Sequence, residues 1–141
     1  MQVKTILDTK GHEFWSVGPQ TSVYDAVRLM AEKEVGSVLV LENGKVQGIV
    51  TERDYARKVV LEGKTSPATP VAEIMTAQVL CTHPEQTIEE AMALMTEKRV
   101  RHLPVLVDGQ ITGVVSIGDL VKAVISEQQF LIQQLESYIT S

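Results

Sequence analysis

The feature that most constrains this fold is an internal repeat. The sequence matches itself without a gap when it is shifted by 65 positions, so that residues 19–54 align with residues 84–119. Thirteen of the 36 aligned pairs are identical. A looser match upstream pairs residues 3–7 with residues 71–75 after a small change in length. Each copy is too short to close a hydrophobic core alone, so the repeat predicts two similar units that pack against each other.

The first half of each copy predicts a short strand followed by a helix. The strand candidates are residues 14–17 and 79–82. Ser22 and Thr87 each stand three residues before an acidic residue, which is the spacing of a helix N-cap. Apolar residues follow at i, i+3, i+4 and i+7, so each helix buries one face.

The second half of each copy predicts a hairpin and a second helix. Two apolar, β-branched strands flank Asn43-Gly44 in one copy and Asp108-Gly109 in the other, and these dipeptides favour tight turns. A helix then begins at Thr51 or Ser116. The order is β-α-β-β-α in both copies, which predicts an α/β (α+β) fold with pseudo-twofold symmetry.

The predicted boundaries follow from the repeat. Residues 1–66 form the first unit with its N-terminal segment, residues 67–125 form the second, and residues 126–141 form a helical extension. A linker at 61–70 carries glycine and proline.

The extension continues an apolar stripe with alternating spacings of four and three residues. It either covers its own unit or forms a dimer contact, and we favour the dimer because the helix outlasts its repeat.

Composition narrows the function. The net charge of −5 argues against a nucleic-acid partner, whose phosphates need basic side chains. A single cysteine cannot form an internal disulfide, the N-terminus lacks the apolar core of a signal peptide, and the apolar runs are too short to cross a membrane. These features predict a cytoplasmic protein without membrane contact.

Two strand-to-helix junctions carry the candidate chemistry. Thr51 and Asp54 lie at the first, and Ser116 and Asp119 lie at the second. A helix N-terminus favours a phosphate, and an ionised Asp there can accept hydrogen bonds from two ribose hydroxyls. The same spacing is also that of a capping box, so these residues could simply begin helices. The two roles do not exclude each other.

These motifs resemble a known family. GIVTERD at 48–54, GVVSIGD at 113–119 and RHLPV at 101–105, with the repeated order of elements, resemble a tandem pair of CBS domains (a Bateman module). The resemblance runs from about Val3 to Ile125 and is strongest to small stand-alone bacterial members. It implies a cleft between the units that binds an adenine nucleotide such as AMP, ADP, ATP or NAD.

The resemblance also implies roles for individual residues. Asp54 and Asp119 would hold ribose, and Thr51 and Ser116 would hold phosphate. Arg101 and His102 would face the phosphates, and Arg53 is a further candidate. Five positions would line the cleft around adenine: Val17, Val38, Cys81, Thr82 and Leu103. Ser16 is also assigned to the nucleotide site, and Pro104 would lie beside the cleft.

The basic residues should make the two sites unequal. Arg101 and His102 align with Gly36 and Ser37 in the first copy, which are small and neutral. Strand alternation would place Arg99 and Arg101 on one face and His102 on the other. A phosphate-rich ligand should therefore depend on the basic pair.

Three function classes remain to be compared. The first is a regulatory nucleotide-binding module that signals to a partner protein by a conformational change. The second is a structural dimerisation module with empty clefts. The third, an enzyme, is disfavoured because the three histidines lack metal-ligand spacing and no nucleophile–base arrangement is evident. We therefore predict a module with neither metal nor catalysis.

Overall fold

Two lobes, one for each copy of the repeat, make up the computed structural model, which describes residues 1–140. The mixture of helices and strands confirms the predicted fold class. In the first lobe, the chain forms β1 (Ser16–Val17), α2 (Val23–Lys33), β2 (Ser37–Glu42), β3 (Lys45–Thr51) and α3 (Glu52–Tyr55), which continues as a π-helix over Ala56–Val60. In the second, it forms α4 (Ile88–Lys98), β4 (His102–Val107), β5 (Gln110–Ser116) and α5 (Ile117–Thr140).

The local signals in the sequence act as predicted. Ser22 and Thr87 cap α2 and α4, since each hydroxyl accepts a hydrogen bond from the backbone N–H three residues on, at 3.1 Å. Asn43 and Asp108 have positive φ angles of 52° and 51° in the two hairpin turns, and a glycine follows each. The predicted hairpins are confirmed: β2 pairs antiparallel with β3, and β4 with β5.

The strand expected at residues 79–82 is the one element that does not form as predicted. In the first lobe, β1 pairs parallel with β2, and the Leu39 N–H donates to the Trp15 carbonyl at 3.0 Å. The residue equivalent to Leu39 is Pro104, which has no N–H to donate. Only an isolated bridge between Thr82 and Val105 remains.

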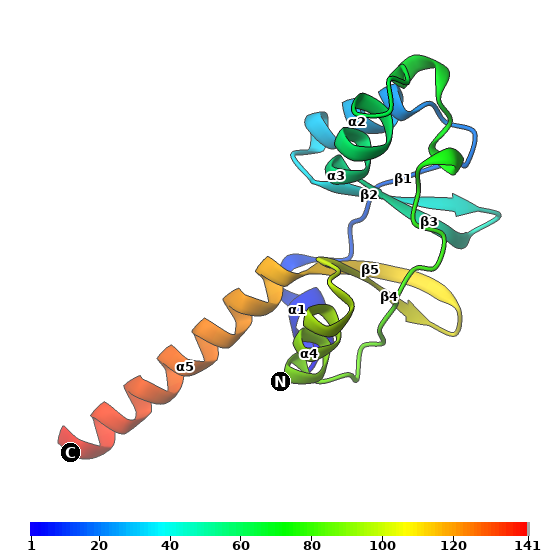
Figure 1. Cartoon of the computed structure of the whole chain (residues 1–141). Coiled ribbons are helices and arrows are strands. Elements are labelled where there is room, and N and C mark those ends of the chain that lie inside the picture. The colour runs from blue at the N-terminus through cyan, green and yellow to red at the C-terminus, as the bar shows by residue number, and fades with distance from the viewer. Residues whose placement is uncertain (141) are drawn as a thin grey trace.

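The leading segment of each copy packs on the other lobe. Helix α1 (Val3–Lys10) places Val3, Ile6 and Leu7 in the core of the second lobe, and Figure 1 shows it beside α4. A 3-10 turn at Val71–Glu73 is the equivalent segment, and it contributes Val71 to the core of the first lobe. The chain therefore crosses between the lobes at both places.

Backbone hydrogen bonds repeat the exchange at equivalent positions. The Val3 N–H donates to the Gln86 carbonyl at 2.9 Å, and the Val71 N–H donates to the Thr21 carbonyl at 2.8 Å. Each lobe needs a segment that comes from outside its own repeat. We therefore expect the folding of the two lobes to be coupled.

Helix α5 continues far beyond the second lobe, as the sequence predicts (Figure 1). Its first turns pack on the second core through Leu120 and Val124, whereas every residue from Gln128 to Thr140 is exposed. Within residues 1–140, no helix has the length and apolar content that crossing a membrane requires.

Two equivalent glycines should respond differently to substitution. A Cβ on Gly48 would lie 2.9 Å from the backbone oxygen of Thr76, which is held by mutual hydrogen bonds with Ile49. A Cβ on Gly113 would lie 2.8 Å from a methyl of Leu7, which can rotate away. We expect Gly48→Ala to lower the free energy of unfolding by about 1–3 kcal/mol and Gly113→Ala to lower it by less, as measured by urea denaturation. Equal losses would contradict this difference.

Candidate functional site

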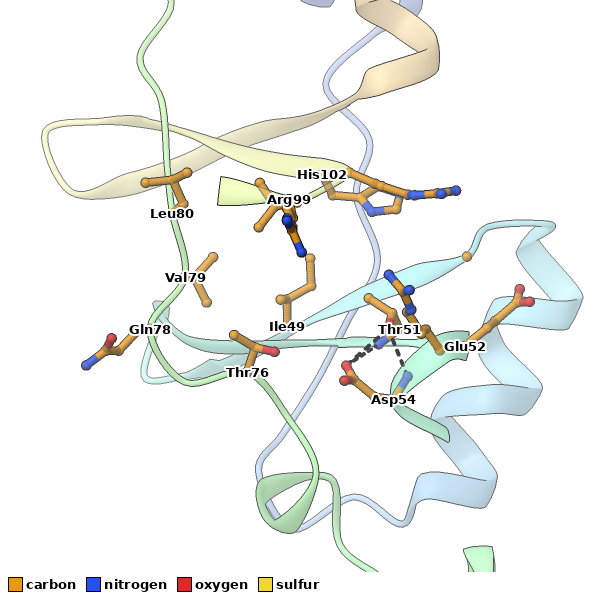
Figure 2. A pocket seen from close by; sticks show the side chains of 14 residues that line it. Ile49, Thr51, Glu52, Asp54, Thr76, Gln78, Val79, Leu80, Arg99 and His102 are labelled. Atoms are coloured by element: carbon orange, nitrogen blue, oxygen red, sulfur yellow. Dashed lines mark hydrogen bonds between the residues drawn. The ribbon is translucent and has the colours of Figure 1, made fainter. Parts of the chain in front are cut away.

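A cavity of about 540 Å³ lies where the two lobes meet. From the first lobe, it is lined by the junction between β3 and α3, including Thr51, Arg53 and Asp54. From the second lobe, it is lined by the turn between α4 and β4, including Arg101, and by His102, the first residue of β4. Figure 2 shows Thr51 and Asp54 on one side of this first cavity and Arg99 and His102 on the other. The fold thus brings five predicted site residues together.

A second cavity, of about 370 Å³, is the pseudo-symmetric counterpart of the first. Its lining includes Ser116, the counterpart of Thr51, and residues 35–37, the counterparts of 100–102. Residues 13–15 replace the loop 78–80. The second cavity is smaller and, as predicted from Gly36 and Ser37, less basic.

The first junction is capped and still open to the cavity. The Asp54 carboxylate accepts hydrogen bonds from the Thr51 N–H at 3.0 Å and the Thr51 hydroxyl at 3.1 Å, and the Asp54 N–H donates back to that hydroxyl at 3.1 Å. The other carboxylate oxygen pairs with Lys58 at 3.1 Å. A carboxylate has about four acceptor positions, so Asp54 can cap α3 and also accept from a ligand hydroxyl that competes with Lys58.

The carboxylate of the second junction also pairs with a lysine. Asp119 accepts from the Ser116 N–H at 2.9 Å and from the Lys10 ammonium at 2.7 Å. Burial opposes ionisation of Asp119, but the hydrogen bonds from Lys10 and Ser116 outweigh it, and the pKa of Asp119 is lowered. Asp119 does not line either cavity, whereas Asp54 lines the first. The two junctions therefore differ in whether their carboxylate reaches a cavity, although a lysine pairs with each.

His102 lines both cavities. Gly36 and Ile49 are the other two residues that the two linings share. Burial lowers the pKa of His102 below its usual value, and nearby Lys10 and Arg101 lower it further, although Asp119 acts in the opposite direction. The imidazole is therefore neutral at neutral pH, and a bound anion would favour its protonated form.

Three arginines line the first cavity. Arg53, Arg99 and Arg101 line it, and they also line an adjoining groove. The expectation that Arg99 shares a strand face with Arg101 is wrong. Arg99 ends α4 in the left-handed conformation, with φ of 56°, and β4 begins only at His102. The helix end, rather than strand alternation, brings Arg99 to the cavity.

The other predicted residues lie outside the cavity linings. Val38 and Leu103 are buried in the cores of the two lobes. Thr82 is buried and hydrogen-bonded to Gln86. Pro104 is buried with its carbonyl accepting from Thr82, and Ser16 and Val17 form β1, next to the lining residue Trp15.

Sequence reasoning missed the loop that closes the first cavity. Thr76, Gln78, Val79 and Leu80 line it, and Figure 2 shows them along the chain that crosses between the lobes. A signal existed: the 65-residue shift places 78–80 opposite 13–15, and both segments follow the exchanged leading segment. Residues 78–80 therefore add both polar and apolar groups to the lining of the first cavity.

The second cavity has an aromatic wall. Trp15 lines it, and the Lys33 ammonium lies 4.4 Å from the centre of the indole ring. This cation–π contact fixes one face of the ring. Cys81, another predicted lining residue, lines neither cavity, and burial raises the pKa of its thiol, which keeps it protonated. Within residues 1–140, no three His, Cys, Asp or Glu side chains come close enough to share a metal ion.

Two duplicated lobes with exchanged leading segments and paired cavities define a tandem two-domain module, and the comparisons agree with this class. The CBS-domain family model matches residues 3–61 and 71–126. The chain belongs to the CBS-domain family and contains two copies of the domain. The predicted resemblance is therefore confirmed.

Relatives and solved structures extend the comparison. The chain is 53% identical to a CBS-domain protein of Burkholderia ambifaria MC40-6, with a TM-score of 0.88 over 91% of this chain and 96% of that one. It is 42% identical to the mitochondrial protein CBSX3 of Arabidopsis thaliana, covering 92% of this chain but 65% of that protein. It is 30% identical to YhcV of Bacillus subtilis, covering 84% of each.

A more distant structure shares the fold. The CBS-domain pair of MJ0100, solved with 5′-methylthioadenosine and S-adenosylmethionine, is 21% identical with a TM-score of 0.79. That pair therefore binds adenosine compounds on the same fold.

Proposed function

We propose that this chain is a regulatory module that binds an adenine nucleotide in the first cavity. One observation carries the proposal: the cavity joins a carboxylate and hydroxyl from one lobe, Asp54 and Thr51, to Arg101 and His102 from the other. Its volume of about 540 Å³ falls in the range of about 300–1,000 Å³ that small-molecule sites occupy.

The geometry suggests how the nucleotide is oriented. Asp54 accepts from the ribose hydroxyls, as an acidic residue does in dinucleotide-binding folds. Arg53, Arg99 and Arg101 receive the phosphates with charge-assisted hydrogen bonds. Adenine lies against the apolar groups of Ile49, Val79, Leu80 and Val100. AMP, ADP, ATP and NAD all present this combination of base, ribose and phosphate.

The bound nucleotide touches both lobes, which gives it a route to signalling. A ligand shifts a conformational equilibrium only when it binds one state more tightly. A nucleotide that bridges Asp54 and Arg101 stabilises the arrangement in which the lobes hold these groups together. An effector protein would recognise that arrangement. Both the effector and the cytoplasmic location stay predictions.

A thermal-shift screen tests the proposal. The purified protein is heated with AMP, ADP, ATP, NAD, S-adenosylmethionine or 5′-methylthioadenosine. A ligand at 100 times its dissociation constant stabilises the fold by about 2.7 kcal/mol, which raises the melting temperature by several degrees. A shift with the phosphate-bearing compounds supports the proposal, whereas no shift with any compound contradicts it.

The alternative is a structural dimerisation module whose cavities stay empty. It is favoured by the capping hydrogen bonds of Asp54 and Asp119, which satisfy both carboxylates without a ligand. It is disfavoured by the convergence of three arginines on a cavity lined by only two carboxylates, Glu52 and Asp54, because this excess of positive charge favours an anion there. The thermal-shift screen separates the two functions.

The state of His102 predicts a pH dependence of binding. A phosphate beside His102 favours its protonated form, and that form becomes more populated as pH falls. Because the pKa of free His102 is lowered, affinity for ATP should rise as pH falls from about 8 to about 6. A one-unit rise in the pKa of His102 on binding strengthens binding by at most about tenfold, and this limit is reached only below the pKa of free His102, so a gain of roughly a few-fold is expected in this range. The phosphates of ATP also change protonation over this pH range. This contribution is the same for His102→Asn, so the difference between the two pH profiles reports His102 alone. Parallel profiles for the two proteins would exclude contact between His102 and phosphate.

A further inference from the structure

The outer part of α5 is an apolar surface that its own chain leaves exposed. Ile132, Leu135 and Ile139 are 53%, 62% and 79% exposed. Clustered apolar exposure of this kind marks an interaction surface. A helix of about 15 residues is also marginal in water without packing against another element. The extension therefore needs an occupant for its apolar face.

The apolar face has the residue spacing of a coiled-coil seam. Its positions alternate in spacing between four and three residues, which corresponds to the d and a positions of successive heptads. The seam covers 19 residues, from 121 to 139, which is about 27 Å of helix at a rise of 1.5 Å per residue. Its d positions are Val121, Gln128 and Leu135, and its a positions are Ile125, Ile132 and Ile139.

This seam is complementary to itself when the direction of the helix is reversed. Turning a second α5 about a point level with residue 130 places Val121 opposite Ile139 and Ile125 opposite Leu135. The same operation places the polar Gln128 opposite Ile132. Every layer then joins a d position with an a position, as antiparallel pairing requires. A twofold contact uses the same patch on both copies, and this patch meets that condition.

The charged residues beside the seam favour the same orientation. In the antiparallel register, the e positions of the two helices face each other, so Lys122 of one copy lies opposite Glu136 of the second, and Gln129 lies opposite Gln129. On the other side, Leu131 lies opposite Leu131. In a parallel pair, Leu131 would instead face Glu136. Charge and apolar groups are therefore matched only in the antiparallel arrangement.

Other occupants fit less well. No lysine or arginine follows Lys122, whereas Glu127 and Glu136 do, so an anionic membrane surface would repel this helix. Lys122 and Glu136 are 14 residues apart, which is about 21 Å along one helix, so they cannot pair within a chain. Their complementarity is usable only between copies.

We propose that α5 pairs with α5 of a second copy of this chain, antiparallel, with Val121 of each opposite Ile139 of the other. The twofold symmetry forms the contact between Lys122 of one copy and Glu136 of the other twice in each dimer, beside the seam. The pairing is independent of nucleotide binding and gives the predicted homodimer a defined interface and register.

Charge reversal tests the register. Sedimentation equilibrium of the full chain should show a dimer, and Lys122→Glu and Glu136→Lys should each weaken dimerisation by about three- to tenfold, because two like-charged contacts replace two attractive ones. The double variant should recover the original dissociation constant. A monomeric full chain, or a double variant weaker than both single variants, would overturn the proposal.

Disulfide trapping tests the orientation directly. In a Cys81→Ser background, Gln129→Cys should form an intermolecular disulfide under mild oxidation, because residue 129 faces itself in the antiparallel register. Gln128→Cys is the matched control, since residue 128 faces itself only in a parallel pair. Trapping through position 128 alone, or a dimer that Ile132→Glu leaves intact, would show that α5 does not pair in this way.

Discussion

Replacing Leu7 by alanine is expected to lower the free energy of unfolding by about 2–5 kcal/mol. Leu7 is 2% exposed and belongs to α1, at the start of the chain, yet it packs in the core of the second lobe with Ile88, Met95 and Leu103. Removing its methyl groups leaves a cavity that the surrounding strands and helices cannot fill. Urea denaturation, with unchanged dependence on denaturant, measures the loss.

Asp8 supplies the control for that substitution. It follows Leu7 on the exposed face of α1, and a surface substitution of this kind changes stability by about 0.5 kcal/mol or less. Asp8→Ala should therefore leave the unfolding midpoint nearly unchanged. Similar effects of the two substitutions would mean that α1 is not docked in the second core and that the exchange of leading segments does not occur.

The second large effect concerns the ligand response. Asp54→Ala removes both a helix cap and the proposed ribose contact, so the thermal shift produced by ATP should disappear. The cap alone contributes about 0.5–2 kcal/mol to stability. Loss of the cap lowers the melting temperature of the free protein. It does not change the additional shift that a bound ligand produces, so a missing shift indicates a lost ligand contact.

Two control substitutions separate these contributions. Thr87→Ala removes the capping box of α4 and should cost similar stability while the ATP response persists. Asp119→Ala removes the carboxylate held by Lys10 and should also spare the response, because the first cavity is intact. If Asp54→Ala behaves like Thr87→Ala, Asp54 is only a cap and the ribose contact is wrong.

Much of this fold can be predicted from the sequence because the repeat displays each local signal twice. The caps at Ser22 and Thr87 and the turns at Asn43 and Asp108 depend on neighbouring residues alone, and all four form as predicted. The exchange of leading segments could not be predicted in this way. It depends on which core Leu7 enters, and hydrophobic spacing says only that one face of α1 is buried.

The candidate site divides along the same line. Thr51, Asp54, Arg101 and His102 belong to recognisable motifs, and the fold brings them to one cavity. Arg99 was placed on the wrong element because a positive φ at a helix end has no clear sequence signal when the residue is not glycine. Lys10 was missed because its contact with Asp119 joins residues 109 positions apart.

Calorimetric titration with ATP and with adenosine tests the central claim most directly. The account predicts saturable binding of ATP by the wild-type protein. It also predicts that Arg101→Ala weakens ATP binding by about ten- to a hundredfold, the loss of one charge-assisted hydrogen bond, while adenosine binding changes by less than about twofold. The single tryptophan, Trp15, lines only the second cavity, so its fluorescence should change little during the titration. Absence of ATP binding, or equal losses for ATP and adenosine, would contradict the account.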